Sequence, residues 1–268
     1  MKYISPGGWF SLEYPKNWNE FQDTEETFLF YNSANWEGNF RISAFKGASS
    51  DYANSCIEDE LKTNSTSVSV KIGQWNCAYS SETFQENGAY YTTHIWVTGI
   101  GQICFECTFT IEKGGKRTVA EEIIRSLKVR NGHEPKEVIP IRILEIEEIN
   151  IAFDWVSNRI KKLLTKDFTS QEEDIYKLQA LVDDGNIQRD QKNTWENIGL
   201  TLATILENEI DGMNWVTVID GRKEYAALQF GDLLIDSKNW IWNQVKSHVP
   251  IDLKSEYIRM KEEVEKRL

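Results

Sequence analysis

The spacing of apolar residues changes partway along this chain of 268 residues, and the change limits the folds that it can adopt. Over most of the first 130 residues apolar and polar side chains alternate, which is the period of a strand with one buried face. From residue 146 onward apolar residues recur at intervals of three and four, which is the period of an amphipathic helix. A chain that passes from strands to helices in this way predicts an α+β fold.

The first half contains six predicted strands and two predicted helices. Trp9 to Tyr14 reads as a strand that Pro15 ends, because proline has no N–H to donate to a neighbouring strand. Residues 51–63 and 117–129 instead carry apolar residues on one helical face. The other strands are predicted at residues 27–32, 39–47, 67–75, 89–99 and 102–114.

This order of elements, with the segment FSLEYPKNW near its start and EEIIRSLKV at its end, resembles the PsbP-like fold family. Phe10, Tyr14, Pro15 and Trp18 carry the likeness, which spans about residues 4–130. The resemblance implies an α/β/α sandwich in which helices cover an antiparallel sheet on both sides. It implies no single function, because proteins of that fold serve as photosystem accessory subunits, transport-factor-binding proteins and secretion or lipoprotein modules.

A joint between two domains is predicted near residue 130. The segment RNGHEPKEVIP combines a glycine, two prolines and mixed charges, which is typical of a connection between domains. We therefore predict a PsbP-like α+β domain at residues 1–130, a linker at 131–142 and a helix-rich α+β domain at 143–268.

The second half begins with predicted helices and ends with a mixture of elements. Ile146 to Leu163 carries a heptad-like apolar stripe, which we expect to pack within its own domain. A further helix is predicted at 170–184, and a third begins with Asn193 as N-cap and Glu196 as its capping-box partner. A β-hairpin is predicted to turn at Asp220-Gly221, followed by a short strand and two helices.

This half resembles a bacterial module known only as a domain of unknown function. The likeness covers roughly residues 145–268 and implies no assigned activity. The residues that carry this likeness are Gly199, Gly212, Trp215, Leu228 and Trp240.

The chain carries 42 acidic and 30 basic side chains, a net charge of −12. Proteins that hold nucleic acid usually present a basic surface to its phosphates, so we expect no nucleic-acid partner. No apolar run has the length of a signal peptide or approaches the roughly 20 residues of a membrane span. We therefore expect a cytoplasmic protein with no membrane partner. Its acidity is an ordinary route to solubility, and the alternative is that it steers a basic protein partner.

The cysteines and histidines lack metal-binding or catalytic spacing. Cys104 and Cys107 lie in a predicted strand, where residues three apart point to opposite faces, so one ion cannot easily contact both sulfurs. No zinc-binding histidine motif, nucleophile elbow or phosphate loop is present. We predict no metal site and no cofactor, and we identify no catalytic residue. The remaining cysteines and histidines of the chain are Cys56, Cys77, His94, His133 and His248.

Adjacent acidic residues are the remaining candidates for catalysis, since paired carboxylates serve glycoside hydrolysis. Most of them fall on exposed faces or in first turns of helices, where negative charge favours the helix dipole, so we expect solvated surface charges. The alternative is a hydrolase or carbohydrate-active enzyme whose site lies in a cleft between the domains. The groups are Glu25 with Glu26, Glu121 with Glu122, Glu147 with Glu148, Glu172 with Glu173 and Asp174, and Asp183 with Asp184.

Ten tryptophans are an unusual feature of the composition, and most of them fall in periodic segments that indicate burial. Trp36 lies in a polar turn, while Trp240 and Trp242 lie near a junction between a strand and a helix. These three are our candidate binding residues, because tryptophan is enriched at the centres of protein interfaces. Core or rim packing is the alternative for each of them.

The sequence thus favours a non-catalytic protein-binding module over an enzyme. The specific form that we consider is an immunity-type or regulatory protein that binds a basic partner, such as a toxin or a nuclease. The competing hypotheses are the hydrolase described above and a purely structural role in a larger assembly, which would leave large apolar patches uncovered on the monomer.

Overall fold

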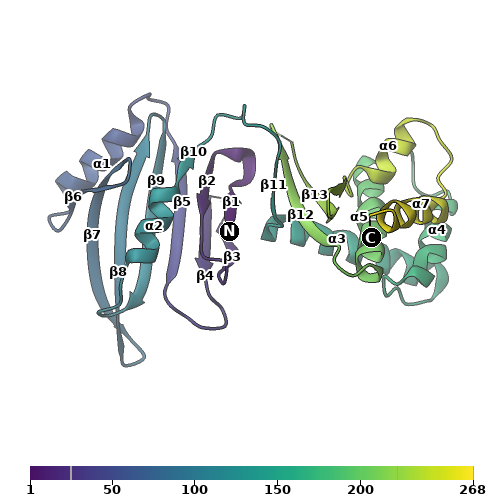
Figure 1. Ribbon diagram of the computed structural model, residues 1–268, viewed down its shortest axis with the longest axis horizontal. Helices are drawn as coiled ribbons and strands as arrows, with labels where there is room; N and C mark the ends of the chain where they lie inside the picture. The colour runs from purple at the N-terminus through teal and green to yellow at the C-terminus, as the bar shows by residue number, and fades with distance from the viewer. Residues whose placement is uncertain (25, 222, 268) are drawn as a thin grey trace. The chain divides into compact units, whose positions relative to one another are not determined.

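The computed structural model describes residues 1–24, 26–221 and 223–267, and Glu25 of the first acidic pair lies outside these residues. The chain divides into two compact units, Met1–Glu134 and Pro135–Leu268 (Figure 1). Each unit combines strands with helices, so the predicted α+β class is confirmed.

The first unit is built mainly from strands. Its helices are η1 (Pro6–Gly8), α1 (Tyr52–Thr63) and α2 (Thr118–Ser126). Its strands are β1 (Lys2–Ile4), β2 (Phe10–Glu13), β3 (Asn19–Thr24), β4 (Thr27–Tyr31), β5 (Asn39–Lys46), β6 (Val68–Ile72), β7 (Trp75–Glu86), β8 (Ala89–Ile100), β9 (Ile103–Glu112) and β10 (Lys128–Val129).

Two antiparallel sheets form in this unit among the described residues: a seven-stranded sheet in the order β3-β4-β5-β9-β8-β7-β6, and a small one in the order β1-β2-β10. The small sheet and α2 cover one face of the large sheet, where Phe10 meets Phe105 with ring centroids 5.3 Å apart. We call this covered face the inner face of the large sheet. Its opposite is the outer face.

The outer face is partly covered by α1. Gly99 pairs with Cys104, and a Cβ at Gly99 would lie 2.9 Å from the Cβ of Ala53 on this helix. Helices therefore lie on both faces of the sheet, as the resemblance implied. Cys104 and Cys107 point to opposite faces, also as predicted, because Cys107 joins the inner core and Cys104 lies beneath α1.

The opening segment contributes to the inner core as expected from its alternation. Phe10 and Leu12 of β2, and Tyr14 just after its end, are buried in this core. After Pro15 the chain turns, and Trp18 stacks on Phe109 of β9 with ring centroids 6.4 Å apart. An abrupt end to the strand is thus what allows the second tryptophan of this segment to pack on the large sheet.

The second unit is built mainly from helices. They are α3 (Ile143–Leu164), η2 (Glu172–Asp174), α4 (Ile175–Asp183), α5 (Lys192–Glu209), α6 (Trp240–Lys246) and α7 (Leu253–Glu265). The strands are β11 (Glu137–Pro140), β12 (Asn214–Asp220), β13 (Lys223–Phe230) and β14 (Leu233–Ile235). Among the described residues they form one antiparallel sheet in chain order, in which β12 and β13 make the predicted hairpin.

Residues 137–140 differ from the predicted linker at 131–142, because they form β11 and pair with β12. Ile139 is buried beside Thr217, while Val138 on the other side of the strand stays largely exposed. A strand of four residues ending in proline has too little alternation to be recognised, and it exists because β12 supplies its hydrogen bonds.

Two helices of this unit are placed differently from the prediction. The buried face of α3 includes Glu145 and Ala152, while Ile146 at the start of the predicted stripe is exposed. The third helix begins at Lys192 with Gln191 as N-cap, so the predicted capping box does not form. Glu196 instead pairs with Lys192 at 3.0 Å.

None of the helices formed by the described residues is long and apolar enough to cross a membrane.

Candidate functional site

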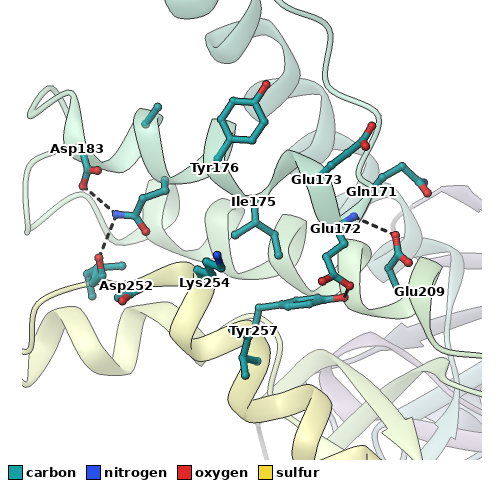
Figure 2. A pocket seen from close by; sticks show the side chains of 14 residues that line it. Gln171, Glu172, Glu173, Ile175, Tyr176, Asp183, Glu209, Asp252, Lys254 and Tyr257 are labelled. Atoms are coloured by element: carbon teal, nitrogen blue, oxygen red, sulfur yellow. Dashed lines mark hydrogen bonds between the residues drawn. The ribbon is translucent and has the colours of Figure 1, made fainter.

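A groove with a volume of about 1150 Å³ runs along the surface of the second unit (Figure 2). It lies between α4 with its preceding turn η2 on one side and the start of α7 on the other, with the end of α5 at one corner. Its lining residues are Gln171, Glu172, Glu173, Ile175, Tyr176, Gln179, Ala180, Asp183, Glu209, Ile251, Asp252, Lys254, Tyr257 and Ile258.

The start of α4 is held in place by a buried carboxylate. Asp174 is fully buried, and its Oδ2 accepts hydrogen bonds from the backbone N–H of Thr169 at 2.5 Å and the hydroxyl of Thr169 at 3.0 Å. Its other oxygen accepts from Nζ of Lys177. Burial works against ionisation, but these hydrogen bonds and the lysine charge outweigh it and lower the pKa of Asp174. The carboxylate thus stays charged and anchors this wall of the groove.

One amide side chain joins the two walls at the other end. Gln179 on α4 donates to the carbonyl oxygen of Ile251 at 3.1 Å and accepts from the backbone N–H of Leu253 at 2.8 Å. The same amide donates to Asp183 at 2.8 Å, a contact that Figure 2 shows. Both ends of the Gln179 amide are therefore used within the protein, and its role is to set the spacing of α4 and α7.

A second set of contacts crosses the groove near η2. Glu172 Oε2 accepts the phenolic hydroxyl of Tyr257 at 3.1 Å and Nζ of Lys261 at 2.6 Å. The hydrogen bond from Lys261 is the main reason that the pKa of Glu172 is lowered. Burial, followed by the hydrogen bond to Glu172, raises the pKa of Tyr257. Glu209 Oε1 accepts from the backbone N–H of Glu172 at 2.9 Å, which ties α5 to the same corner.

The groove combines apolar side chains with a negative rim. Ile175 and Tyr257 form a buried floor, whereas Tyr176 and Ile258 are 54% and 44% exposed on opposite walls. Among the described residues that line it, five carboxylates stand against the single ammonium group of Lys254. Exposed apolar surface bounded by carboxylates suits a ligand that is apolar on one side and cationic at its edges.

The three candidate tryptophans lie in different environments. Trp36 is 41% exposed and meets Tyr91 edge to face, with ring centroids 5.9 Å apart. Trp240 is only 7% exposed and donates its indole N–H to Glu256 Oε2 at 3.1 Å, so its ring belongs to the core and is closed to surface contact. Trp242 packs partly buried against the same core, with Nζ of Lys246 5.8 Å from its ring centroid. Trp36 belongs to the first unit, whereas the residues that line the groove belong to the second.

The acidic groups behave mainly as structural charges. Glu172 and Asp252 line the groove with pKa values lowered by hydrogen bonds, from Lys261 and from the start of α7 respectively. Glu207 has a pKa raised by burial but lies outside this lining. Within residues 1–24, 26–221 and 223–267, no group of three or more cysteine, histidine or acidic side chains is arranged to hold a metal ion.

The sequence singled out Glu172, Glu173 and Asp183 as members of acidic groups, but it did not single out the other residues that make the groove. Tyr176, Gln179 and Tyr257 each lie on predicted helices, but none stands in a motif. The missing information was that α4 and α7, separated by some 70 residues, lie side by side.

Two known families match this chain, one mainly over the first unit and the other within the second. Residues 1–150 match the family described as domain of unknown function DUF3805, and residues 174–257 match that described as domain of unknown function DUF3806. The second match spans α4 to the start of α7 and so contains most of the groove. No curated protein matches the chain.

Solved structures similar to this chain include a crystal structure from Bacteroides thetaiotaomicron VPI-5482. It is 48% identical, with 96% of each chain covered and a TM-score of 0.93. The solution structure of cyanobacterial PsbP (CyanoP) from Synechocystis sp. PCC 6803 is 12% identical, covering 48% of this chain and 92% of that one with a TM-score of 0.24. LpqN, involved in cell envelope biogenesis of Mycobacterium tuberculosis, is 12% identical, covering 46% and 83% with a TM-score of 0.31. PsbP-like proteins are thus among the structural neighbours, at weak similarity.

Proposed function

Because the chain belongs to the DUF3805 family, whose description assigns no activity, we propose a function from the groove itself: a non-catalytic module that binds a partner protein. The partner contributes a segment with an apolar face and basic edges. This segment lies between α4 and α7, and the single observation that carries the proposal is the apolar floor bounded by carboxylates.

The shape of the groove supports an amphipathic helix as the bound segment. Amphipathic helices are commonly recognised by laying an apolar face into a groove, with anchor side chains spaced three and four residues apart. Tyr176 and Ile258 offer apolar contact from opposite walls, and Ile175 lies between them on the floor. Such a segment would bury apolar surface that the free protein leaves exposed to water.

Charge supports a basic partner. Glu173 and Glu209 lie on the rim with their carboxylates exposed, and the chain as a whole has a net charge of −12. Complementary charge accelerates encounter and excludes acidic competitors more than it adds affinity, so binding should be faster at low salt.

The walls are held before any partner arrives, which favours affinity. Gln179 and Glu172 each connect α4, or the turn before it, to α7. A pre-organised groove loses little conformational entropy when a ligand enters. A specific form of the proposal is an immunity-type protein that neutralises a basic toxin or nuclease by covering its basic surface.

The test uses a leucine–lysine peptide designed as an amphipathic helix, with fluorescence anisotropy as the readout. We expect binding by the full chain and none by a counterpart in which glutamate replaces lysine. Ile258→Ser and Glu173→Lys should each weaken binding about tenfold, the effect of losing one anchor contact. The matched controls are Ile151→Ser, at an isoleucine 66% exposed on α3, and Glu58→Lys on α1.

Unchanged affinity in both groove variants would refute the groove as the binding site. Equal affinity for the glutamate peptide would refute the role of charge. Loss of binding in the control variants to the same extent would show that the peptide adheres to the surface at large.

A further inference from the structure

A second surface with binding chemistry lies on the first unit, on the outer face of the large sheet. At the end of the β7–β8 hairpin this face carries three neighbouring aromatic rings. Tyr91 on β8 stacks with Phe84 on β7, with ring centroids 5.7 Å apart and an interplanar angle of 29°. Trp36, from the loop before β5, meets the same Tyr91 at 5.9 Å and 78°. We call Trp36, Phe84 and Tyr91 the aromatic cluster.

The aromatic cluster is accessible. Trp36 is 41% exposed, Phe84 is 38% exposed and Tyr91 is half-buried between them. The covering helix α1 lies near the other end of this face, where Ala53 meets Gly99. The register places Tyr91 opposite Glu112 and Gly99 opposite Cys104, so the cluster and the helix contact are eight positions apart along β9.

Two carboxylates lie near the aromatic cluster on the same face, and a third is adjacent to Trp36 in the chain. Glu112 lies directly opposite Tyr91 across the β8–β9 ladder, and Glu82 precedes Phe84 by two residues and therefore points the same way. Glu37 follows Trp36 in the chain and accepts a hydrogen bond from the amide of Asn35 at 3.0 Å. All three carboxylates are exposed.

The neighbouring lysine does not neutralise this group. Lys113 follows Glu112, but it lies over the ring of Tyr90 at 5.4 Å, and Tyr90 points to the inner face because it alternates with Tyr91. Arg41 also belongs to the outer face, opposite Thr108, four residues along β9 from Glu112. Beside the rings themselves, Glu82 and Glu112 are the charged groups that the register places on this face, and Arg41 lies farther along the sheet.

We propose that the aromatic cluster and its three carboxylates bind arginine-rich segments of a protein. A guanidinium group stacks on the face of an aromatic ring and forms paired hydrogen bonds with a carboxylate, so it matches both components of this surface. The hydroxyls of Thr93 and Thr110, hydrogen-bonded to each other at 2.9 Å, lie beside Glu112 and Tyr91 on the same face. This site does not require the groove, which belongs to the other unit.

Carbohydrate is the competing occupant, since flat aromatic rings also hold sugar. The three carboxylates near the rings favour the cationic guanidinium group of arginine over a neutral sugar. A sugar gains hydrogen bonds from them but no charge pairing, whereas each arginine gains both.

The experiment uses the full chain carrying the groove substitutions Glu173→Lys and Ile258→Ser, so that its outcome is independent of the proposed function. The probe is octa-arginine. Its binding is monitored through the nitrogen–proton NMR signal of the Trp36 indole, which is assigned by its loss in Trp36→Phe. The Trp195 indole, hydrogen-bonded to the carbonyl oxygen of Gln188 at 3.0 Å, serves as the internal reference. A parallel titration uses cellohexaose.

We expect octa-arginine to shift the Trp36 signal and to leave that of Trp195 in place. Phe84→Ala and Glu112→Gln should each weaken binding about threefold, the effect of one exposed cation–π or charge contact. The matched controls, Phe45→Ala and Glu106→Gln, change exposed residues of the same face nearer α1 and should have no effect.

Three results would overturn the proposal: a Trp36 signal that octa-arginine does not move, equal losses of affinity in the control variants, or a response to cellohexaose without one to octa-arginine. The last result would assign the surface to carbohydrate.

Discussion

Tyr257 on α7 donates its hydroxyl to Glu172 in the turn before α4, at 3.1 Å and across 85 residues of sequence. Lys261, one helical turn beyond Tyr257, pairs with the same carboxylate oxygen at 2.6 Å. One carboxylate therefore connects α7 to the wall opposite it. We therefore expect the attachment of α7 to this wall to depend in part on the charge of Glu172.

Acid should weaken this connection. The pKa of Glu172 is lowered by the hydrogen bond from Lys261, so the carboxylate stabilises the fold fully above its ordinary value of 4.5. That stability is lost as pH falls through the lowered pKa, because protonation removes the ion pair. Glu172→Gln should thus lose less stability than the wild type between about pH 6 and about pH 3. Urea unfolding midpoints measure the difference. Tyr257→Phe, which keeps the Lys261 pair, should retain most of the wild-type acid sensitivity, and identical acid profiles for wild type and Glu172→Gln would contradict the assignment.

Arg142 supports the second unit from inside. It is almost wholly buried, and it donates to Glu145 and Glu224 at 2.9 Å each, while Thr217 donates to Glu145 at 3.0 Å. Burial opposes the charge, but the two carboxylates outweigh it and raise the pKa of Arg142. Arg142→Met should destabilise the protein by about 3–5 kcal/mol, because it leaves carboxylates buried without their partner.

The double variant Arg142→Met with Glu145→Leu tests this reason. It should cost less than Arg142→Met alone, since a buried unpaired charge is more costly than an apolar replacement of the pair. Chemical denaturation of the wild type, the single variants Arg142→Met and Glu145→Leu, and the double variant gives the comparison. Additive losses would instead indicate that Arg142 contributes mainly through packing.

Gly199 should not tolerate a methyl group, although it lies inside a helix. A Cβ on Gly199 would meet the carbonyl oxygen of Ser237 at 2.7 Å, where the loop after β14 crosses α5. Alanine improves helix propensity by about 1 kcal/mol over glycine, but overpacking costs about 1–3 kcal/mol. We expect Gly199→Ala to lower the thermal midpoint and Asn197→Ala, two residues earlier, to leave it unchanged or raise it. A stabilised Gly199→Ala protein would show that the loop yields without cost.

The four cysteines should differ in reactivity. Burial raises the pKa values of Cys77, Cys104 and Cys107, and the thiolate is the reactive form, whereas Cys56 is only half-buried. Iodoacetamide should therefore label Cys56 first in the native protein and the other three only after denaturation. Peptide mass spectrometry identifies the sites. Early labelling of Cys107 would mean that the inner core opens readily.

Much of the first unit was predictable because its strands are long and alternate strictly. The strands predicted at 89–99 and 102–114 correspond to β8 at Ala89–Ile100 and β9 at Ile103–Glu112. The predicted strand at 67–75 ends where the twelve-residue β7 begins, so β7 was missed, and β3 was missed as well. The short strands β1 and β10 were also missed. They contain too few residues to show a period, and they form because β2 supplies their hydrogen bonds.

The exposure of the candidate tryptophans was predictable only in part. Trp36 was selected because it lies in a polar turn, and it does stand exposed. Trp240 was selected on similar grounds, yet its indole N–H finds an acceptor in Glu256 sixteen residues later, which permits burial. Local composition does not reveal such distant partners.

The sequence alone determined the α+β class, the two halves and the acidic character of the chain, because period and charge are properties of neighbouring residues. Only the tertiary structure decided that Glu172 meets Tyr257 and that Trp36 meets Tyr91. Both contacts depend on how distant segments pack together, and the apolar period of a helix or strand specifies which face is buried without specifying its neighbour.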